Sequence, residues 1–243
     1  MYGLQENPAV QISLVTPSEC YRQLTQGEAD VGLIPVIGLQ QNSKIRALKG
    51  LGIAAVQRTE SIYLFSTKPL DRLATVTTDP ASLTSVALLK IILKKKYQNS
   101  PEFRSGDISN IHNVLKTSDA VLVIGDEAIL AEKTDYDHYD LATEWYSITR
   151  LPFIFAVWAC SRQLSQEEEG WLRQCYELAT SHWEEIIQQA RILVDVDEEF
   201  LKRYYKMNLH YRLTKQDYEG LIKFLSLAAE CGIIETIRKD IWA

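Results

Sequence analysis

The sequence contains few cysteines and no long apolar run, and each shortage excludes a class of protein. Its four cysteines are widely spaced without a C-x-x-C pair, so neither a disulfide framework nor a zinc knuckle is predicted. No stretch reaches the roughly 18 apolar residues of a membrane span, and the chain does not begin with the pattern of a signal peptide. We therefore expect buried thiols in a cytoplasmic protein that has no membrane partner.

Positive charge is also in short supply. Lys and Arg total 26 against 32 Asp and Glu, which gives a formal net charge of -6. This balance provides no general attraction for nucleic-acid phosphates or anionic lipid, so we expect no nucleic-acid partner. The 243 residues are 46% hydrophobic and 24% charged, as in a globular protein of one or two lobes. The composition does not assign an oligomeric state.

The common catalytic and nucleotide-binding motifs are missing as well. The four histidines show no H-E-x-x-H spacing, and none accompanies a G-x-S-x-G segment. Neither G-x-G-x-x-G nor G-x-x-x-x-G-K-[ST] occurs. We therefore expect no metal and no cofactor, and a small anion would have to be bound by locally placed groups.

What the sequence does contain is strand and helix patterning from its first part onward. Gln11–Val15 alternates polar and apolar residues like a strand, and Thr16-Pro17-Ser18 offers a cap for a helix over Glu19–Thr25. Gly27 ends that helix, and the apolar run Asp30–Pro35 reads as a buried strand. The segment predicts a strand, a helix and a strand joined by a parallel crossover.

The rest of the chain continues with strands and then with helices. We expect strands over 53–56, 61–66, 75–77, 120–124 and 153–159, and helices over 84–96, 127–133, 165–190, 198–207 and 214–232. Ser165 and Glu168 have the spacing of a capping box, and Gly232 suits a left-handed residue after the last helix.

These elements predict an α/β protein of two lobes, with a helical C-terminal tail. Extended segments near 66–69 and 159–161 separate the middle unit from both ends of the chain. Residues 1–66 plus 162–243 would form lobe I, and residues 67–161 would form lobe II. This is the layout of a periplasmic-binding-protein-like (type II) fold, in which a ligand lies in the cleft and a hinge closes.

The most informative stretch for function is Thr77–Val86, where a strand feeds a helix through a turn rich in hydroxyl groups. A helix start presents free N–H groups and a partial positive charge, which receive a carboxylate well. The ligand suggested is an organic anion. The alternative is that Ser82 or Thr84 only caps the helix.

Three further positions are candidates for ligand binding. Ser18 lies in a second hydroxyl-rich helix start, which would hold another carboxylate or would only cap its helix. Gly125-Asp126 ends a buried strand, where α/β sheets place ligand-contacting loops, although Asp126 would serve equally as a helix cap. Arg150 would pair with a carboxylate through its planar fork or lie solvated at the surface.

Several of these stretches together resemble one known family. In this order and spacing the chain resembles the chorismate dehydratase family over nearly its whole length, and the combination is more specific than any single motif. The stretches that carry the resemblance are Thr16–Cys20, Gly27–Pro35, Asp79–Leu89, Leu122–Ala128 and Tyr139–Trp158.

The resemblance implies an enzyme of menaquinone biosynthesis by the futalosine pathway. It would be a carbon-oxygen lyase (hydro-lyase) that removes water from chorismate to give 3-[(1-carboxyvinyl)oxy]benzoate, without cofactor or metal. In the family picture Thr84 and Ser85 contact the substrate, so Ser85 is the expected catalytic residue, and the substrate's own enolpyruvyl carboxylate takes the ring proton. From the residue pattern, and not from the resemblance, Ser18, Gly125 and Asp126 are the further expected substrate contacts.

The chain departs from the family pattern at two places. The family begins with a strand that carries an Asn-x-x-Pro segment, which Asn7-Pro8 does not replace, so we expect a late start assignment or a shortened chain. Arg150 stands where the family usually has glycine before Leu-Pro-Phe. A binding protein that closes on a small carboxylate therefore remains the alternative. A dihydroxynaphthoate synthase is disfavoured, because no histidine lies in the loop before the closing strand.

Overall fold

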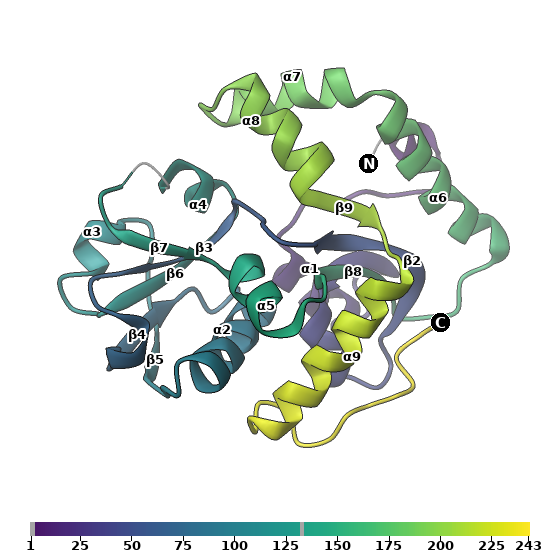
Figure 1. Cartoon of the computed structure of the whole chain (residues 1–243). Coiled ribbons are helices and arrows are strands. Elements are labelled where there is room, and N and C mark those ends of the chain that lie inside the picture. Colours follow the sequence, from purple (N-terminus) through teal and green to yellow (C-terminus); the bar gives the residue numbers. More distant parts are fainter. Residues whose placement is uncertain (1–2, 132–133) are drawn as a thin grey trace.

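The computed structural model describes residues 3–131 and 134–243 and arranges their strands in two sheets (Figure 1). The four-stranded sheet has the order β1 (Val31–Pro35), β8 (Phe153–Cys160), β2 (Arg46–Ala55) and β9 (Leu209–Arg212). The five-stranded sheet has the order β5 (Glu102–Ser105), β4 (Thr75–Thr78), β6 (Ala120–Ile124), β3 (Ile62–Ser66) and β7 (Asp137–Asp140). The predicted α/β class with a helical C-terminal part is confirmed.

The helices surround both sheets, and α7 and α8 lie above β9 at the top of Figure 1. The α-helices are α1 (Pro17–Gln26), α2 (Leu83–Lys96), α3 (Ile111–Val114), α4 (Asp126–Ala131), α5 (Leu141–Thr149), α6 (Gln166–Ser181), α7 (Trp183–Leu193), α8 (Glu198–Arg203) and α9 (Lys215–Glu230). Short 3-10 helices are η1 (Leu4–Glu6), η2 (Val36–Gln40) and η3 (Leu70–Arg72), and η4 (Tyr204–Asn208) is a π-helix. No helix in the described part of the chain combines the length and apolar character needed to cross a membrane.

The sequence predicted several helix ends correctly. Thr16 caps α1 with its side chain, and Pro17 occupies the first helical position. Ser165 and Glu168 form the predicted capping box of α6. Gly232 follows α9 with a φ of +75°, a left-handed conformation that costs glycine little.

The first part of the chain differs from the prediction. Gln11–Val15 forms no strand, and β1 pairs antiparallel with β8, so that Leu33 lies opposite Trp158. The predicted parallel crossover is therefore wrong. Alternation alone does not make a strand, because the backbone groups also need a neighbouring strand as hydrogen-bonding partner.

Two helix predictions differ from the structure. The predicted helix over 165–190 is divided between α6 and α7 at His182, whose φ of -118° and ψ of 28° are not helical. The predicted helix over 198–207 is α8 followed by the π-helix η4. The predicted end of the helix over 127–133 lies outside the described residues.

Sheet membership favours other positions for the two crossings between lobes than the predicted ones. The predicted division at 66 and 162 put β3 in lobe I and β8 in lobe II, which is opposite to their sheet membership. We propose instead that residues 1–58 and 151–243 form lobe I and residues 59–150 form lobe II. At the first crossing, Asp140 Oδ2 accepts hydrogen bonds from the backbone amides of Thr59 and Glu60 at 2.9 and 2.8 Å.

The two lobes share one hydrophobic cluster. It contains side chains of both sheets, such as Ile34 and Val157 of one and Val76 and Leu122 of the other. At its centre Trp145 of α5 packs edge to face against Phe153 of β8 and Phe224 of α9, and its Nε1 donates a hydrogen bond to the Pro152 carbonyl at 3.2 Å. The lobes are therefore joined by packing as well as by the crossings.

Candidate functional site

The directions of the strands bring the predicted ligand-binding loops together on the side of the five-stranded sheet where β4 and β6 end. We call this side the sheet edge. β4 and β6 run parallel with Thr78 opposite Leu122, so both end at this edge. β3 is antiparallel to β6 with Ile62 opposite Ile124, so it begins there. The turn into α2, the Gly125-Asp126 loop and the segment before β3 therefore lie side by side, as expected for a site at the ends of strands.

The start of α2 has hydrogen-bonding groups without partners. Ser82 is the N-cap residue, but its side chain caps nothing, and its Oγ is buried with no hydrogen-bond partner among the described residues. The backbone amides of Thr84 and Ser85 also donate no hydrogen bond to any of the described residues. Buried polar groups are normally paired, so an unpaired hydroxyl beside free amides indicates a place for an anionic ligand.

Thr84 and Ser85 lie where the sequence predicted them, on the first turn of α2. Both are buried, with exposed fractions of 4% and 5%. Thr84 Oγ1 accepts a hydrogen bond from the Ile37 amide at 3.4 Å. Because Ile37 belongs to η2 of lobe I, this contact connects the helix start to the other lobe.

Gly125 and Asp126 occupy the neighbouring loop. Gly125 has a φ of +70°, and its amide donates to the Ser61 carbonyl at 2.8 Å. Asp126 is exposed and is itself the first residue of α4, so it does not have the helix-cap position that was the alternative. Burial raises the pKa of the Tyr204 phenol to about 12, and the nearby negative charge of Asp126 also raises this pKa.

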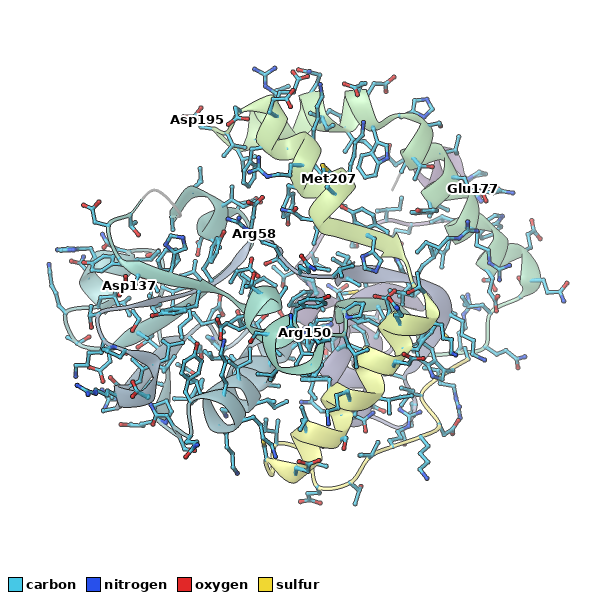
Figure 2. All side chains as sticks on the ribbon, viewed as in Figure 1. Arg58, Asp137, Arg150, Glu177, Asp195 and Met207 are labelled. Atoms are coloured by element: carbon cyan, nitrogen blue, oxygen red, sulfur yellow. The ribbon has the colours of Figure 1, made fainter. Side chains whose placement is uncertain are left out.

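Ser18 and Arg150 lie on other elements, at the start of α1 and at the end of α5. Ser18 is half-buried in α1 of lobe I, and its Oγ lies 3.3 Å from the capping oxygen of Thr16. Arg150 is exposed at the end of α5, between the lobes at the front of Figure 2, with its guanidinium 5.5 Å from the Tyr146 ring centre. Its φ of +60° is left-handed, which explains physically why glycine suits this position.

Three residues of this region, Glu60, Ser61 and Tyr204, were not among the predicted site residues. The Tyr204 hydroxyl donates to Ser61 Oγ at 3.0 Å, directly beside Gly125. Glu60 is 3% exposed, and its carboxylate binds Arg203 and Asn208 at 3.0 and 2.6 Å. The only sequence signal was the position of Ser61 at the start of a predicted strand, because the partners lie about 140 residues later in the chain.

A separate cavity of about 400 Å³ lies on the other side of α2. Its lining includes Leu83, Ala87 and Lys90, which share one face of the helix at spacings of three and four residues. Ser85 points to the opposite face, and none of the predicted site residues lines this cavity. We therefore place the candidate site at the sheet edge.

Comparison with solved structures identifies the fold. A structural-genomics protein from Archaeoglobus fulgidus has a TM-score of 0.75 at 20% identity, covering 92% of this chain and 87% of that one. The periplasmic aliphatic sulphonate binding protein of Escherichia coli has a TM-score of 0.64 at 14% identity, covering 98% and 84%. The predicted periplasmic-binding-protein-like fold is confirmed.

Comparison with known sequences identifies the family. The family model described as menaquinone biosynthesis matches residues 1–230. A chorismate dehydratase of Thermus thermophilus is 31% identical over 229 residues, which cover 86% of this chain and 83% of that protein. One of Campylobacter jejuni is 32% identical over 74 residues, covering 30% and 33%. The chain therefore belongs to the menaquinone-biosynthesis family, as the sequence motifs had predicted, and chorismate dehydratase of Thermus thermophilus is its relative.

Proposed function

We propose that this protein is a chorismate dehydratase, a hydro-lyase that acts in the cytoplasm. The observation that carries the proposal is the start of α2, where the buried Ser82 hydroxyl and the Thr84 and Ser85 amides have no partner among the described residues. An organic anion fits these donors. The likeness to a dehydratase along most of the chain supports chorismate as that anion.

The reaction would need little acid-base chemistry from the protein. The ring C–O bond breaks, the hydroxyl departs, and a ring proton is lost, so that water leaves and the ring becomes aromatic. The substrate's own enolpyruvyl carboxylate would take the ring proton. The donors at α2 would fix the ring carboxylate, with Ser85 nearest the reacting ring, and fixed donors of this kind also stabilise charge that develops during reaction. Gly125 and Asp126 would border the ring, and Ser18 would approach from lobe I.

Incubation of the purified protein with chorismate tests the proposal. We expect an aromatic ultraviolet spectrum to appear and the mass of the compound to fall by one water, at a rate proportional to protein concentration. A protein-free incubation measures spontaneous decay of chorismate. Chorismate that binds saturably but is recovered unchanged would instead identify a binding protein and reject the dehydratase.

Ser82 offers a test of the anion site that separates binding from stability. Replacing an N-cap serine by alanine usually costs about 1 kcal/mol, but Ser82 makes no capping bond, so Ser82→Ala should leave the unfolding free energy unchanged or slightly higher. The affinity for chorismate should fall about tenfold, the equivalent of about 1.4 kcal/mol. Calorimetric titration and thermal unfolding measure the two effects.

Ser165→Ala is the matched control for this measurement. Ser165 does cap its helix, so its loss should lower stability by about 1 kcal/mol and leave chorismate affinity unchanged. If Ser82→Ala behaved in the same way as Ser165→Ala, the unpaired hydroxyl would not belong to a ligand site.

A further inference from the structure

Ser61 adds a further hydroxyl to the site, on a different segment from the start of α2. The residue is 5% exposed and directly precedes β3, and its carbonyl accepts a hydrogen bond from the Gly125 amide at 2.8 Å. Its Oγ accepts a hydrogen bond from the Tyr204 hydroxyl at 3.0 Å. A serine hydroxyl carries one proton of its own, and no acceptor in residues 3–131 and 134–243 takes it. Ser61 therefore has a proton to donate at the edge of the site.

The surroundings of Ser61 hold this hydroxyl in place. The neighbouring Glu60 has a φ of +59°, and its buried carboxylate binds Arg203 and Asn208, which lie on either side of Tyr204 in the sequence. Figure 2 shows Arg58, which also pairs with Glu60 at 3.1 Å, between the two lobes. Residues 203–208 of lobe I are thereby held against Glu60, where the chain first crosses from lobe I to lobe II. They include a π-helix, a rare element that often occurs at functional sites.

The separation of Ser61 from α2 suits a ring with polar groups at its two ends. β6 lies between β4, which leads into α2, and β3, which follows Ser61. Two strand spacings amount to about 10 Å. If the start of α2 holds the ring carboxylate of chorismate, Ser61 lies toward the opposite end of the ring, which carries the hydroxyl that leaves.

We propose that Ser61 is a catalytic residue whose hydroxyl donates a hydrogen bond to the departing ring hydroxyl, and that Tyr204 is its positioning residue. This inference rests on the proposed dehydratase function. A donor aimed at the leaving oxygen stabilises the negative charge that builds there as the C–O bond breaks. Tyr204 acts by donating to Ser61 Oγ, which directs the Ser61 proton toward the substrate.

Steady-state kinetics of four variants test the assignment. We expect Ser61→Ala to lower kcat about 100-fold with little change in KM, because the contact forms fully only in the transition state. Tyr204→Phe should lower kcat about tenfold, and the double variant should be no slower than Ser61→Ala, because the tyrosine acts only through the serine. Tyr205→Phe, in which the adjacent ring is kept, is the matched control and should retain normal kcat.

Several outcomes would overturn the inference. An unchanged kcat in Ser61→Ala, or a raised KM at normal kcat, would remove Ser61 from the leaving group. Effects that multiply in the double variant would show that Tyr204 does not act through Ser61. Ser61→Thr keeps a hydroxyl and should therefore retain most of the activity. Thermal unfolding of Ser61→Ala shows whether that variant is folded. Failure of the unaltered protein to convert chorismate would reject the dehydratase and this assignment together, whereas an active protein with an active Ser61→Ala variant rejects only the assignment.

Discussion

Replacing Ser85 by alanine should lower kcat for chorismate dehydration about 100- to 1,000-fold, the usual loss when one fixed donor is removed from a transition state. Ser85 is buried on the first turn of α2, beside the unpaired amides and Ser82. Its hydroxyl is therefore one of few donors that meet the substrate without competition from water. The measurement is the rate of aromatic product formation at saturating chorismate.

A second serine provides the control for Ser85→Ala. Ser181 is exposed at the end of α6, where its hydroxyl contacts only its own segment, the Leu178 carbonyl at 2.8 Å and His182 Nδ1 at 3.0 Å, so Ser181→Ala should keep full activity. Thermal unfolding of both variants detects any loss of structure. Equal rates of chorismate conversion by Ser85→Ala and the unaltered protein would exclude Ser85 from the mechanism.

Replacing Trp145 by alanine should lower the free energy of unfolding by about 3 to 5 kcal/mol, as for other large aromatic side chains in a core. Trp145 is fully buried, and it packs against Phe153 and Phe224 with ring centres 5.3 and 6.4 Å away. The substitution removes apolar contacts between the lobes and also takes the indole donor away from the Pro152 carbonyl. The variant would leave a cavity where lobe I and lobe II meet.

Urea titration measures this loss as a shift of the unfolding midpoint at constant slope. Trp145→Phe, which keeps an aromatic ring, should lose clearly less, and Trp171→Ala, which removes a half-buried tryptophan of α6, serves as the control away from the joint. A loss below about 1 kcal/mol for Trp145→Ala would show that the site collapses easily and that the lobes do not depend on this contact.

The sequence predicted the apolar strands of the fold better than the polar ones at the sheet edges. β1, β3, β6 and β8 are rich in apolar residues, many of them buried, and their positions were predicted closely. The strands that were missed are β5, β7 and β9. Each is an outermost strand of its sheet and carries charged or polar residues. Edge strands commonly carry such residues, so their apolar signal is weak.

The site was predictable only where it depends on one continuous segment. The hydroxyl-rich turn before α2 and the Gly125-Asp126 loop are both local patterns that follow strands, and the structure places them at the same edge. The pairing of Ser61 with Tyr204 joins residues that are far apart in the chain, so no spacing indicated it. The lobe boundaries were predicted from local extended segments, whereas sheet membership, on which the proposed boundaries rest, depends on distant partners.

The position of β8 between β1 and β2 also determines when each sheet can form during synthesis on the ribosome. All strands of the five-stranded sheet are complete once Asp140 has been made, whereas β1 and β2 must wait for β8, which ends at Cys160. At about 5 to 20 residues per second, the roughly hundred residues between β2 and the end of β8 take on the order of 5 to 20 seconds. We expect the middle of the nascent chain to fold before its beginning, with the apolar β1 and β2 segments exposed to chaperones during that interval.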